Sequence, residues 1–325
     1  AILMSVNSGE ILSMVSLPDF DLNKREDISD RKFINRSTKG VYELGSVFKT
    51  FTLAAGLQQN VIQEDTLFKN LPKKIKCAGR SISEYDMDIP SSLTAEEILI
   101  RSGNIGSIKI AQKVGLENFK DFLENLDLLN KIQFDIEEVG NPIPFKWGKC
   151  KLATSAYGHG ITTTPLQLAK AYAIIANGGY KIKPTLIKKE KNLKRGEQII
   201  TQENSNKINE ILRKIVTSEQ GTANLANIAG YEIAGKTGTA QKSIKGKYSK
   251  KKINTFASIF PISSPKYVLI VLLDEPKLSE TYIYEYNDGK KRKIIGTPFN
   301  TAGWTSVEVA KNIIEKIGPI LAIKY

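Results

Sequence analysis

A serine and a lysine stand three positions apart at Ser46 and Lys49, where ELGSVFKTF leads into an apolar segment. A serine hydroxyl becomes a good nucleophile only when a nearby base removes its proton, and a desolvated lysine can be that base. Gly45 allows a sharp turn, and the apolar spacing of VFKTFTLAAGLQQN predicts a helix that carries both side chains on one face. The pair therefore has the types and spacing needed for acyl transfer.

The spacing alone selects nothing, because a serine at a helix start is most often an N-cap. Two further motifs supply the missing context. Ser102 and Asn104 flank Gly103 between two helical stretches, where a turn can point both polar side chains into a cleft. Lys236, Thr237 and Gly238 lie on a predicted strand and offer a cation, a hydroxyl and backbone amides. The same serine-lysine spacing recurs, without such context, at Ser29 with Lys32, Ser249 with Lys252 and Ser263 with Lys266.

The rest of the composition excludes several classes of site. The chain has one histidine, His159, and two cysteines that form no C-x-x-C pair, so the usual zinc-ligand spacings cannot be assembled. We interpret His159 as a structural brace for a loop, and the two cysteines leave the redox compartment open. The net charge of +13 comes from lysine-rich stretches with few aromatic residues, which favours solvated loops over a nucleic-acid groove. Attraction to an anionic membrane surface or wall polymer is a further interpretation.

A competing motif overlaps the third one. Residues 230–237, GYEIAGKT, match the P-loop pattern of nucleotide-binding proteins, and VLIVLLDE resembles the acidic strand that usually follows. A P-loop needs a buried strand before the glycines and a helix after them. TANLANIA before Gly230 is no buried strand, and GTAQKSIKGKYSKKK after Thr237 has no apolar helical stripe. We therefore interpret the match as a coincidence and keep an ATPase as an alternative.

The elements that would position these residues form a mixed α/β (α+β) fold. Both ends of the chain read as antiparallel strands: AILMSVNSGEILSMVSL as a hairpin, then YEIAGKTGTAQ, NTFASIF and YVLIVLLDE, with GWTSVEVAKNIIEKIG as a closing helix. Thr94 with Glu97, and Thr164 with Pro165 and Gln167, mark two helix starts. We expect an α/β part at 1–75 and 178–325 and an all-helical part at 76–177.

With S-x-x-K, S-x-N and K-T-G in this order, the chain resembles the transpeptidase domain of class B penicillin-binding proteins. SGEILSMVSLPDFDLN, FINRSTKGVYELGSVFK, SAYGHGITTTPLQLAKAYAIIANGG, SEQGTA and AGKTGTAQK also resemble that family, in the expected order. The YGHG segment is more similar to the cell-division type than to the elongation type. The resemblance implies the penicillin-binding transpeptidase and β-lactamase-like fold over residues 1–325.

The resemblance implies a role for each motif residue. Ser46 would be the acylated nucleophile and Lys49 its base, while Ser102 would relay a proton to the leaving group. Asn104 would hold the amide backbone of a D-alanyl-D-alanine stem peptide, and Lys236 would support the proton network. No metal or cofactor is implied.

The K-T-G strand would bind the donor. The hydroxyls of Thr237 and Thr239 would hold its terminal carboxylate beside Gly238, and the amides of Ser46 and Thr239 would form the oxyanion hole. Two features depart from the family pattern. Gly103 replaces the usual side-chain residue, and TAGWTSVEV leaves the late wall of the site undefined.

The resemblance also implies partners and a location. The substrates would be peptidoglycan stem peptides, the inhibitors β-lactams, and the partners a membrane glycosyltransferase and other divisome proteins. The domain would lie in the periplasm, attached to the bacterial inner membrane through an N-terminal anchor and pedestal region that we expect to precede residue 1. A β-lactamase or β-lactam sensor on the same fold stays an alternative, although no E-x-x-L-N stretch lies between Ser102 and Lys236.

Overall fold

The centre of the fold is a five-stranded antiparallel sheet with the strand order β2-β1-β9-β8-β7. The computed structural model describes residues 1–21, 23–24, 30, 33–189, 195–244, 247–287 and 291–324. The strands of this sheet are β1 (Ile2–Ser5), β2 (Ile11–Met14), β7 (Ala234–Ile244), β8 (Lys247–Phe260) and β9 (Tyr267–Asp274). The predicted N-terminal hairpin and the three predicted late strands are confirmed. β9 lies centrally because its run YVLIVLLD is apolar on both faces.

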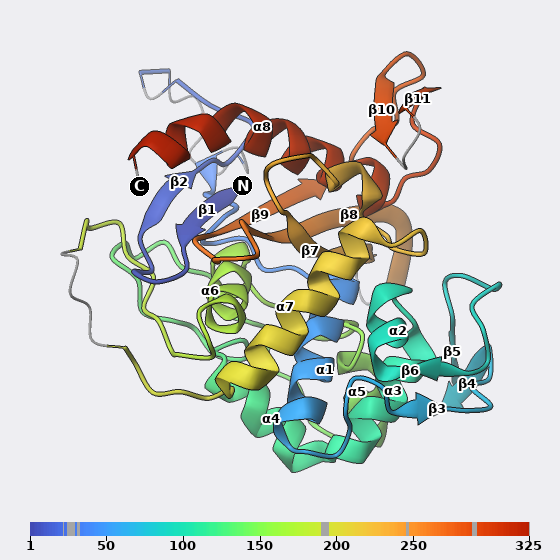
Figure 1. The fold of residues 1–325 in the computed structure, drawn as a ribbon. Coiled ribbons are helices and arrows are strands. Elements are labelled where there is room, and N and C mark those ends of the chain that lie inside the picture. The colour runs from blue at the N-terminus through green and yellow to red at the C-terminus, as the bar shows by residue number, and fades with distance from the viewer. Residues whose placement is uncertain are drawn as a thin grey trace.

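Helices cover both faces of this sheet (Figure 1). α6 packs against β1, β8 and β9 on one face, and α8 packs against β8 and β9 on the other. One continuous hydrophobic cluster joins the sheet to the helices below it. The helices are α1 (Lys49–Gln58), α2 (Ala95–Ile100), α3 (Asn104–Val114), α4 (Leu116–Asn125), α5 (Lys149–Ser155), α6 (Pro165–Ala176), α7 (Gln202–Thr217) and α8 (Ser306–Lys324), with short 3₁₀ turns η2 (Gly45–Phe48), η3 (Asn224–Ala226) and η4 (Ala302–Trp304).

Both predicted helix starts are confirmed by their caps. Thr94 begins α2 with a capping box to Glu97, and Thr164 begins α6 with a capping box to Gln167. Pro165 occupies the first turn of α6, where a missing N–H costs nothing. These caps fix the entry points of two helices that frame the centre of the molecule. None of the described helices is long and apolar enough to cross a membrane.

The stretch that we expected to be largely helical contains strands at its start. β4 (Lys74–Cys77) and β5 (Arg80–Ser83) form a hairpin, and β3 (Leu67–Phe68) pairs with β6 (Leu93–Thr94). The segment KIKCAGRSIS alternates polar and apolar residues around an Ala-Gly turn, which is a hairpin pattern. In addition, α6 packs on the sheet. The boundaries of the helical part at residues 76 and 177 stay a prediction. The start of this stretch is not helical, because it contains β5, β6 and the end of β4.

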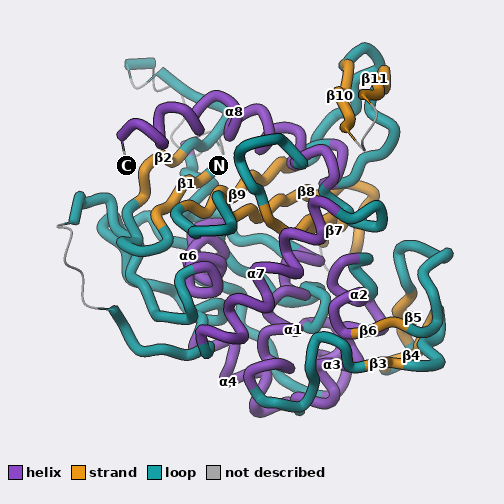
Figure 2. Tube along the Cα trace, viewed as in Figure 1, coloured by secondary structure: helices purple, strands orange, loops and turns teal. Residues whose placement is uncertain are grey.

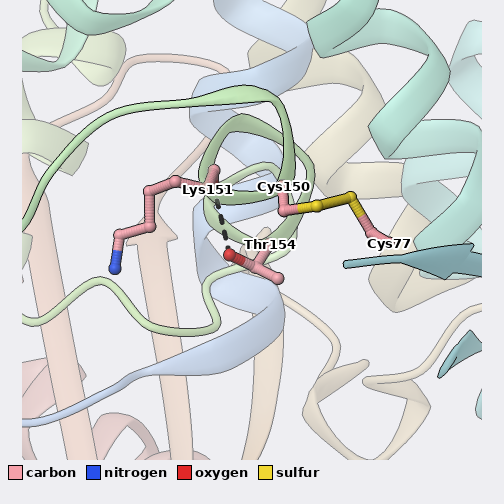
Figure 3. The surroundings of a disulfide bond; sticks show 4 residues. All are labelled: Cys77, Cys150, Lys151 and Thr154. Carbon is pink, nitrogen blue, oxygen red and sulfur yellow. Dashed lines mark hydrogen bonds between the residues drawn. A yellow bond between two sulfur atoms is a disulfide. The ribbon is translucent and has the colours of Figure 1, made fainter. Parts of the chain in front are cut away.

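A disulfide joins the β4–β5 hairpin to α5, although the sequence analysis left the two cysteines unpaired. Cys77 is the last residue of β4 and Cys150 is the second residue of α5, with a Cα–Cα distance of 5.6 Å (Figure 3). The bond spans 73 positions of sequence. It therefore links two secondary-structure elements that are far apart in the sequence.

A second hairpin stands away from the main sheet, as Figures 1 and 2 show. It consists of β10 (Ile283–Asn287) and β11 (Lys291–Ile295), which pair antiparallel. Tyr284 attaches it to the body of the molecule, because its ring contacts that of Trp304 and its hydroxyl donates to the Trp304 carbonyl at 2.9 Å. The sequence analysis did not predict this hairpin, although Asn-Asp-Gly at 287–289 is a typical hairpin turn signal.

Candidate active site

Ser46 lies in a 3₁₀ turn immediately before α1. Gly45 has a φ of +62°, a backbone conformation that favours glycine, and this turns the chain into η2. The Tyr172 hydroxyl of α6, buried beneath the turn, donates to the Val47 carbonyl at 3.0 Å. Within the described part of the chain the Ser46 hydroxyl makes no hydrogen bond, and the residue lines a cleft of about 750 Å³. Ser46 is therefore held by its backbone at the wall of the cleft.

Two buried lysines converge on Ser102. Lys49 Nζ lies 3.1 Å from Ser102 Oγ and also donates to the Ser102 carbonyl, and Lys236 Nζ lies 2.9 Å from the same Oγ. Lys49 is 1% exposed and Lys236 is fully buried. Residues from three distant parts of the sequence thus form one network beside the nucleophile.

Burial weakens the basicity of both lysines. Desolvation disfavours an ammonium ion, and it lowers the pKa of Lys49 to about 7, while the charge of Glu84 opposes that shift. The pKa of Lys236 falls well below its usual value, first through desolvation and then through repulsion by Lys49. Two adjacent buried cations repel each other, so one of the pair is readily deprotonated near neutral pH. Each lysine also donates to a backbone carbonyl, Lys49 to that of Ser102 and Lys236 to that of Thr237 at 3.0 Å.

The S-x-N turn, residues 102–104, lies between α2 and α3 and is held by hydrogen bonds to residues outside these two helices. Ser102 has a φ of +58°, a strained conformation for a residue with a side chain. Asn104 begins α3, and its Nδ2 donates to the Ser83 carbonyl at 2.8 Å. Glu84, next after β5, accepts N–H bonds from Asn104 at 2.6 Å and Ile105 at 2.8 Å. The β4–β5 hairpin therefore fixes the turn that carries Ser102.

The K-T-G residues lie on β7, which is an edge strand of the main sheet and runs along η2. A Cβ on Gly238 would lie 2.3 Å from the Leu44 carbonyl oxygen and 3.2 Å from the Val47 amide nitrogen. Only glycine allows so close an approach to the backbone of the serine turn. A Cβ on Gly45 would in turn meet the Thr239 carbonyl oxygen at 3.2 Å. The backbone amides of β7 and of the serine turn η2 therefore lie close together.

The hydroxyls of β7 face the cleft and already have partners. Thr237 Oγ1 lies 2.6 Å from Thr222 Oγ1, and Thr239 Oγ1 accepts the Ala302 N–H at 2.9 Å. An oxygen that accepts such a bond still has its own hydrogen to donate. The late wall, undefined from sequence, is built by η4, whose Gly303 and Trp304 line the cleft together with Thr301.

The segment after α5 forms another wall of the cleft. Tyr157 and His159 line it, and the His159 ring contacts the rings of Tyr157 and Tyr248. Burial lowers the pKa of His159, with the charge of Glu43 acting in the opposite direction. A Cβ on Gly158 would lie 2.0 Å from the Gly45 carbonyl oxygen, so this segment packs directly on the serine turn. His159 serves packing there, in line with the predicted structural role.

The other serine-lysine pairs lie elsewhere. Ser249 lies on β8 and its hydroxyl donates to the Lys242 carbonyl at 3.2 Å, while Ser263 donates to Glu232 at the surface. Ser29 and Lys32 fall outside the described residues. Of the pairs that the structure describes, only the one at 46 and 49 has its serine in the cleft lined by Ser102 and Thr237.

The P-loop match lacks the backbone that a P-loop requires. Lys236 and Thr237 lie inside the strand β7, which continues to Ile244, and the next described element is the strand β8 rather than a helix. The Lys236 side chain is buried against Ser102 and is not extended from a glycine loop. The interpretation of the match as a coincidence agrees with this geometry.

Comparison with known proteins decides the family. The family model of the penicillin-binding protein transpeptidase domain matches residues 1–300. The chain belongs to this family. This transpeptidase domain is 32% identical over 334 residues to a probable peptidoglycan D,D-transpeptidase FtsI of Caulobacter vibrioides, covering 99% of this chain and 54% of that protein. It is 30% identical to the peptidoglycan D,D-transpeptidase FtsI of Escherichia coli K12, covering 87% of this chain and 48% of that protein. The family predicted from the motifs is confirmed.

The fold agrees with a solved structure. The transpeptidase domain of penicillin-binding protein 3 from Burkholderia pseudomallei superposes with a TM-score of 0.81 at 24% identity, covering 98% of this chain and 87% of that chain. The predicted fold class is therefore confirmed. Our transpeptidase domain spans about half the length of the FtsI proteins that it matches.

Sequence reasoning missed the charged residues that border the cleft, among them Glu84, Asp86 and Arg101. Glu84 borders the cleft and contacts the backbone of Asn104, yet it lies in SEYD, a segment with no motif. The alternation of KIKCAGRSIS predicts a hairpin that ends just before Glu84, but no local pattern places that end beside the S-x-N turn. The sequence around Glu84 also matches no motif that would mark it as part of a site.

Proposed function

We propose that this transpeptidase domain is a serine D,D-transpeptidase that is acylated at Ser46 by a D-alanyl-D-alanine stem peptide. It then passes the acyl group to an amine on a neighbouring peptidoglycan strand. The observation that carries the proposal is the convergence of Lys49 and Lys236 on the Ser102 hydroxyl, in the cleft that Ser46 lines. The names of the FtsI relatives support the same activity. The chemistry follows from the geometry of the residues.

Acylation begins with proton transfer. Neutral Lys49 takes the proton of Ser46 Oγ, and the oxygen attacks the carbonyl carbon of the penultimate D-alanine. The tetrahedral oxyanion would be held by the amides of Ser46 and Thr239. When the C–N bond breaks, a proton passes from Lys49 through the Ser102 hydroxyl to the departing amine of the terminal D-alanine, since Ser102 Oγ contacts both lysines.

The donor peptide would lie along β7. Its outer edge pairs with no strand in the described sheet, so an extended peptide can add to it through main-chain hydrogen bonds. Asn104 uses Nδ2 on the Ser83 carbonyl, which leaves Oδ1 to accept an N–H of the peptide. Thr237 and Thr239 would donate to the terminal carboxylate, with the positive charge of Lys236 behind them.

The second half-reaction separates a transpeptidase from a β-lactamase. An amine must attack the ester, while hydrolysis needs a carboxylate placed to activate water. Of the described carboxylates that border the cleft, Glu84 is occupied by two backbone N–H groups, Asp86 pairs with Arg101 at 3.5 Å, and Glu219 is exposed on the segment after α7. We therefore propose a long-lived acyl-enzyme.

The wider setting is part of the same proposal. We infer a role in septal wall synthesis, with a membrane glycosyltransferase and other divisome proteins as partners, because several relatives carry the FtsI name. The Cys77–Cys150 disulfide supports a location outside the reducing cytoplasm, since such bonds persist in the periplasm. An inner-membrane anchor outside this chain would then hold the domain at the wall.

The deciding experiment is labelling with a fluorescent penicillin, followed by mass spectrometry of the modified peptide. We expect the adduct on Ser46, its loss in Ser46→Ala and its retention in the matched control Ser249→Ala. The adduct should persist for many minutes to hours. Label on Ser249 would refute the assignment of the nucleophile, and release of free penicilloate within seconds, with turnover, would make the protein a β-lactamase.

The ATPase alternative has its own test. Calorimetry with ATP and Mg²⁺ should give no heat of binding at millimolar ligand, because the segment 230–237 runs into a strand. Saturable binding that Lys236→Ala removes would favour the ATPase instead.

A further inference from the structure

Glu84 is a buried carboxylate at the inner end of the β4–β5 hairpin. It is 7% exposed and follows directly on β5. Both of its oxygens are engaged, one by the Asn104 N–H at 2.6 Å and the other by the Ile105 N–H at 2.8 Å. Its own N–H donates to the Lys73 carbonyl at 3.0 Å, which fixes it to the neighbouring strand end.

A buried carboxylate is costly, so its position calls for an explanation. The first residues of α3 need hydrogen-bond acceptors, and the residue before the helix, Gly103, has no side chain to supply one. Glu84 supplies it from another segment, with a negative charge at the positive end of the helix. A neutral acceptor at position 103 would be a simpler cap, but a Cβ there would already meet Ile89 Cδ1 at 3.2 Å.

The second effect of Glu84 is on the buried cations. Its charge acts on Lys49 against the effect of burial. The other charged groups around Lys49 are Lys236 from β7 and His159 from the segment after α5. Glu43 acts on His159 and is engaged by the Gly160 N–H and the Tyr248 hydroxyl.

The remaining carboxylates that border the cleft are less suited to this role. Asp86 is paired with Arg101, and Glu219 lies exposed on the segment after α7. Within the described part of the site, Glu84 is therefore the buried carboxylate whose charge acts on Lys49. It also holds the residues on the C-terminal side of Ser102, whose carbonyl accepts from Lys49 on the other side.

We propose that Glu84 is a positioning residue for the acylation of Ser46, fixing the Ser102 turn against Lys49 and offsetting the charge of that buried lysine. The inference rests on the proposed serine acyl-enzyme and adds a residue to it. Glu84 touches no reacting atom and acts through Asn104 and Lys49. The hairpin that carries it is tied down by the Cys77–Cys150 disulfide, which explains why a loop residue can hold so exact a place.

The sign of the charge effect follows from linkage. Glu84 raises the pKa of Lys49 and burial lowers it, with burial the larger cause. Removing the charge leaves burial unopposed, so the pKa of Lys49 falls further and the neutral base appears at lower pH. The acylation rate at low pH then gains relative to the plateau at high pH, although the plateau itself falls because the turn is less well held.

The test is the rate of acylation by a fluorescent penicillin, measured from pH 5 to 9 in wild type, Glu84→Gln, Glu84→Asp and Glu97→Gln. Glu97 is the matched control, because it is another carboxylate that caps a helix start, accepting the Thr94 N–H at 2.8 Å, but it does not border the cleft. Thermal unfolding of each variant is measured alongside.

We expect Glu84→Gln to lower the midpoint of the pH profile by about half a unit or more and the plateau by about tenfold, since one hydrogen bond to a charged acceptor is lost. Glu84→Asp keeps the negative charge, so its midpoint should stay close to that of wild type, while its plateau falls because the shorter side chain no longer reaches both N–H groups. Glu97→Gln should change neither. A Glu84→Gln variant that unfolds earlier but keeps the wild-type midpoint is a helix cap only, and overturns the proposal.

The positioning role of Glu84 and the proposed acylation of Ser46 can fail separately. Wild-type protein that takes up no penicillin on Ser46 refutes the proposed function before any variant is compared. If Glu84→Gln is recovered unfolded, Glu84→Asp decides: a wild-type plateau overturns the positioning role, and a reduced plateau with an unchanged midpoint supports it.

Discussion

Replacing Gly238 by alanine tests whether the contact between β7 and the serine turn sets the geometry of acylation. The added Cβ would lie 2.3 Å from the Leu44 carbonyl oxygen, 3.0 Å from Val47 Cγ1 and 3.2 Å from the Val47 nitrogen. Two of these three atoms belong to the backbone and cannot rotate away. Ordinary contacts of this kind lie beyond about 3.4 Å, so the strand and the turn must separate by about 1 Å.

The size of the effect follows from that displacement. Thr239 is the next residue of β7, and its amide moves with the strand away from the Ser46 amide. A misplacement of about 1 Å at a reacting centre costs about 100-fold in rate, as does the loss of one oxyanion donor at the lower end of its range. Overpacking of this kind also costs about 1–3 kcal/mol of stability. We expect Gly238→Ala to acylate about 100-fold more slowly and to unfold a few degrees earlier.

The assay is the second-order rate of adduct formation with a fluorescent penicillin, with Tm measured on the same samples. Gly56→Ala is the control, because its Cβ would meet Ile62 Cδ1 at 2.7 Å and Ile110 Cγ2 at 2.9 Å, both side-chain methyl groups in the core rather than backbone atoms. It should lose stability without a comparable loss of rate. If Gly238→Ala acylates within about threefold of wild type despite a lowered Tm, the Thr239 amide is no part of the oxyanion hole.

The remaining predictions concern the base, the cross-link and the carboxylate site. Acylation should rise with pH through about 7, because only neutral Lys49 can take a proton, and Lys49→Arg should lose about 100-fold or more while the control Lys252→Arg keeps the wild-type rate. A flat profile between pH 6 and 8 would contradict this role. Replacing Cys77 and Cys150 together by serine should cost about 2–5 kcal/mol in denaturant unfolding, and a thiol reductant should destabilise wild type but not the double variant. Thr239→Val should weaken penicillin capture about tenfold and Thr239→Ser should restore it, because the lost group is the hydroxyl; equal loss in both variants would point to packing.

Local patterns made part of the site predictable. The element that carries each of two motifs was predictable: the glycine before Ser46 and the apolar spacing after it indicated a helix start, and the pattern around Lys236 indicated a β-strand. The structure places the Ser102 hydroxyl between the side chains of Lys49 and Lys236. Capping boxes fixed two helix starts for the same reason, since the bonds involved span three residues. The catalytic roles of these residues stay predictions until they are tested by labelling.

The rest depended on contacts between distant segments. Whether Cys77 meets Cys150 is decided by where the rest of the fold places α5 and the β4–β5 hairpin, and one pair of cysteines in a chain of this length gives no spacing rule. Glu84 is likewise recognisable only once Asn104 and Ile105 lie beside it. The partners that Ala302 and Thr222 provide for the threonines of β7 come from loops whose course no local pattern specifies.

The order of the strands has a consequence for how the chain acquires its fold. β1 pairs with β9, so Ile2 lies opposite Ile270, and the strand that bears Lys236 pairs with β8. Synthesis from the N-terminus therefore delivers Ser46 and its helix long before the strands that complete the sheet. Such non-local pairing is slow because a long loop must close before the contacts that reward it can form. Until β9 is available, the apolar strands β1 and β2 have no partner beyond each other, and the unfinished chain is at its most exposed to aggregation and proteolysis.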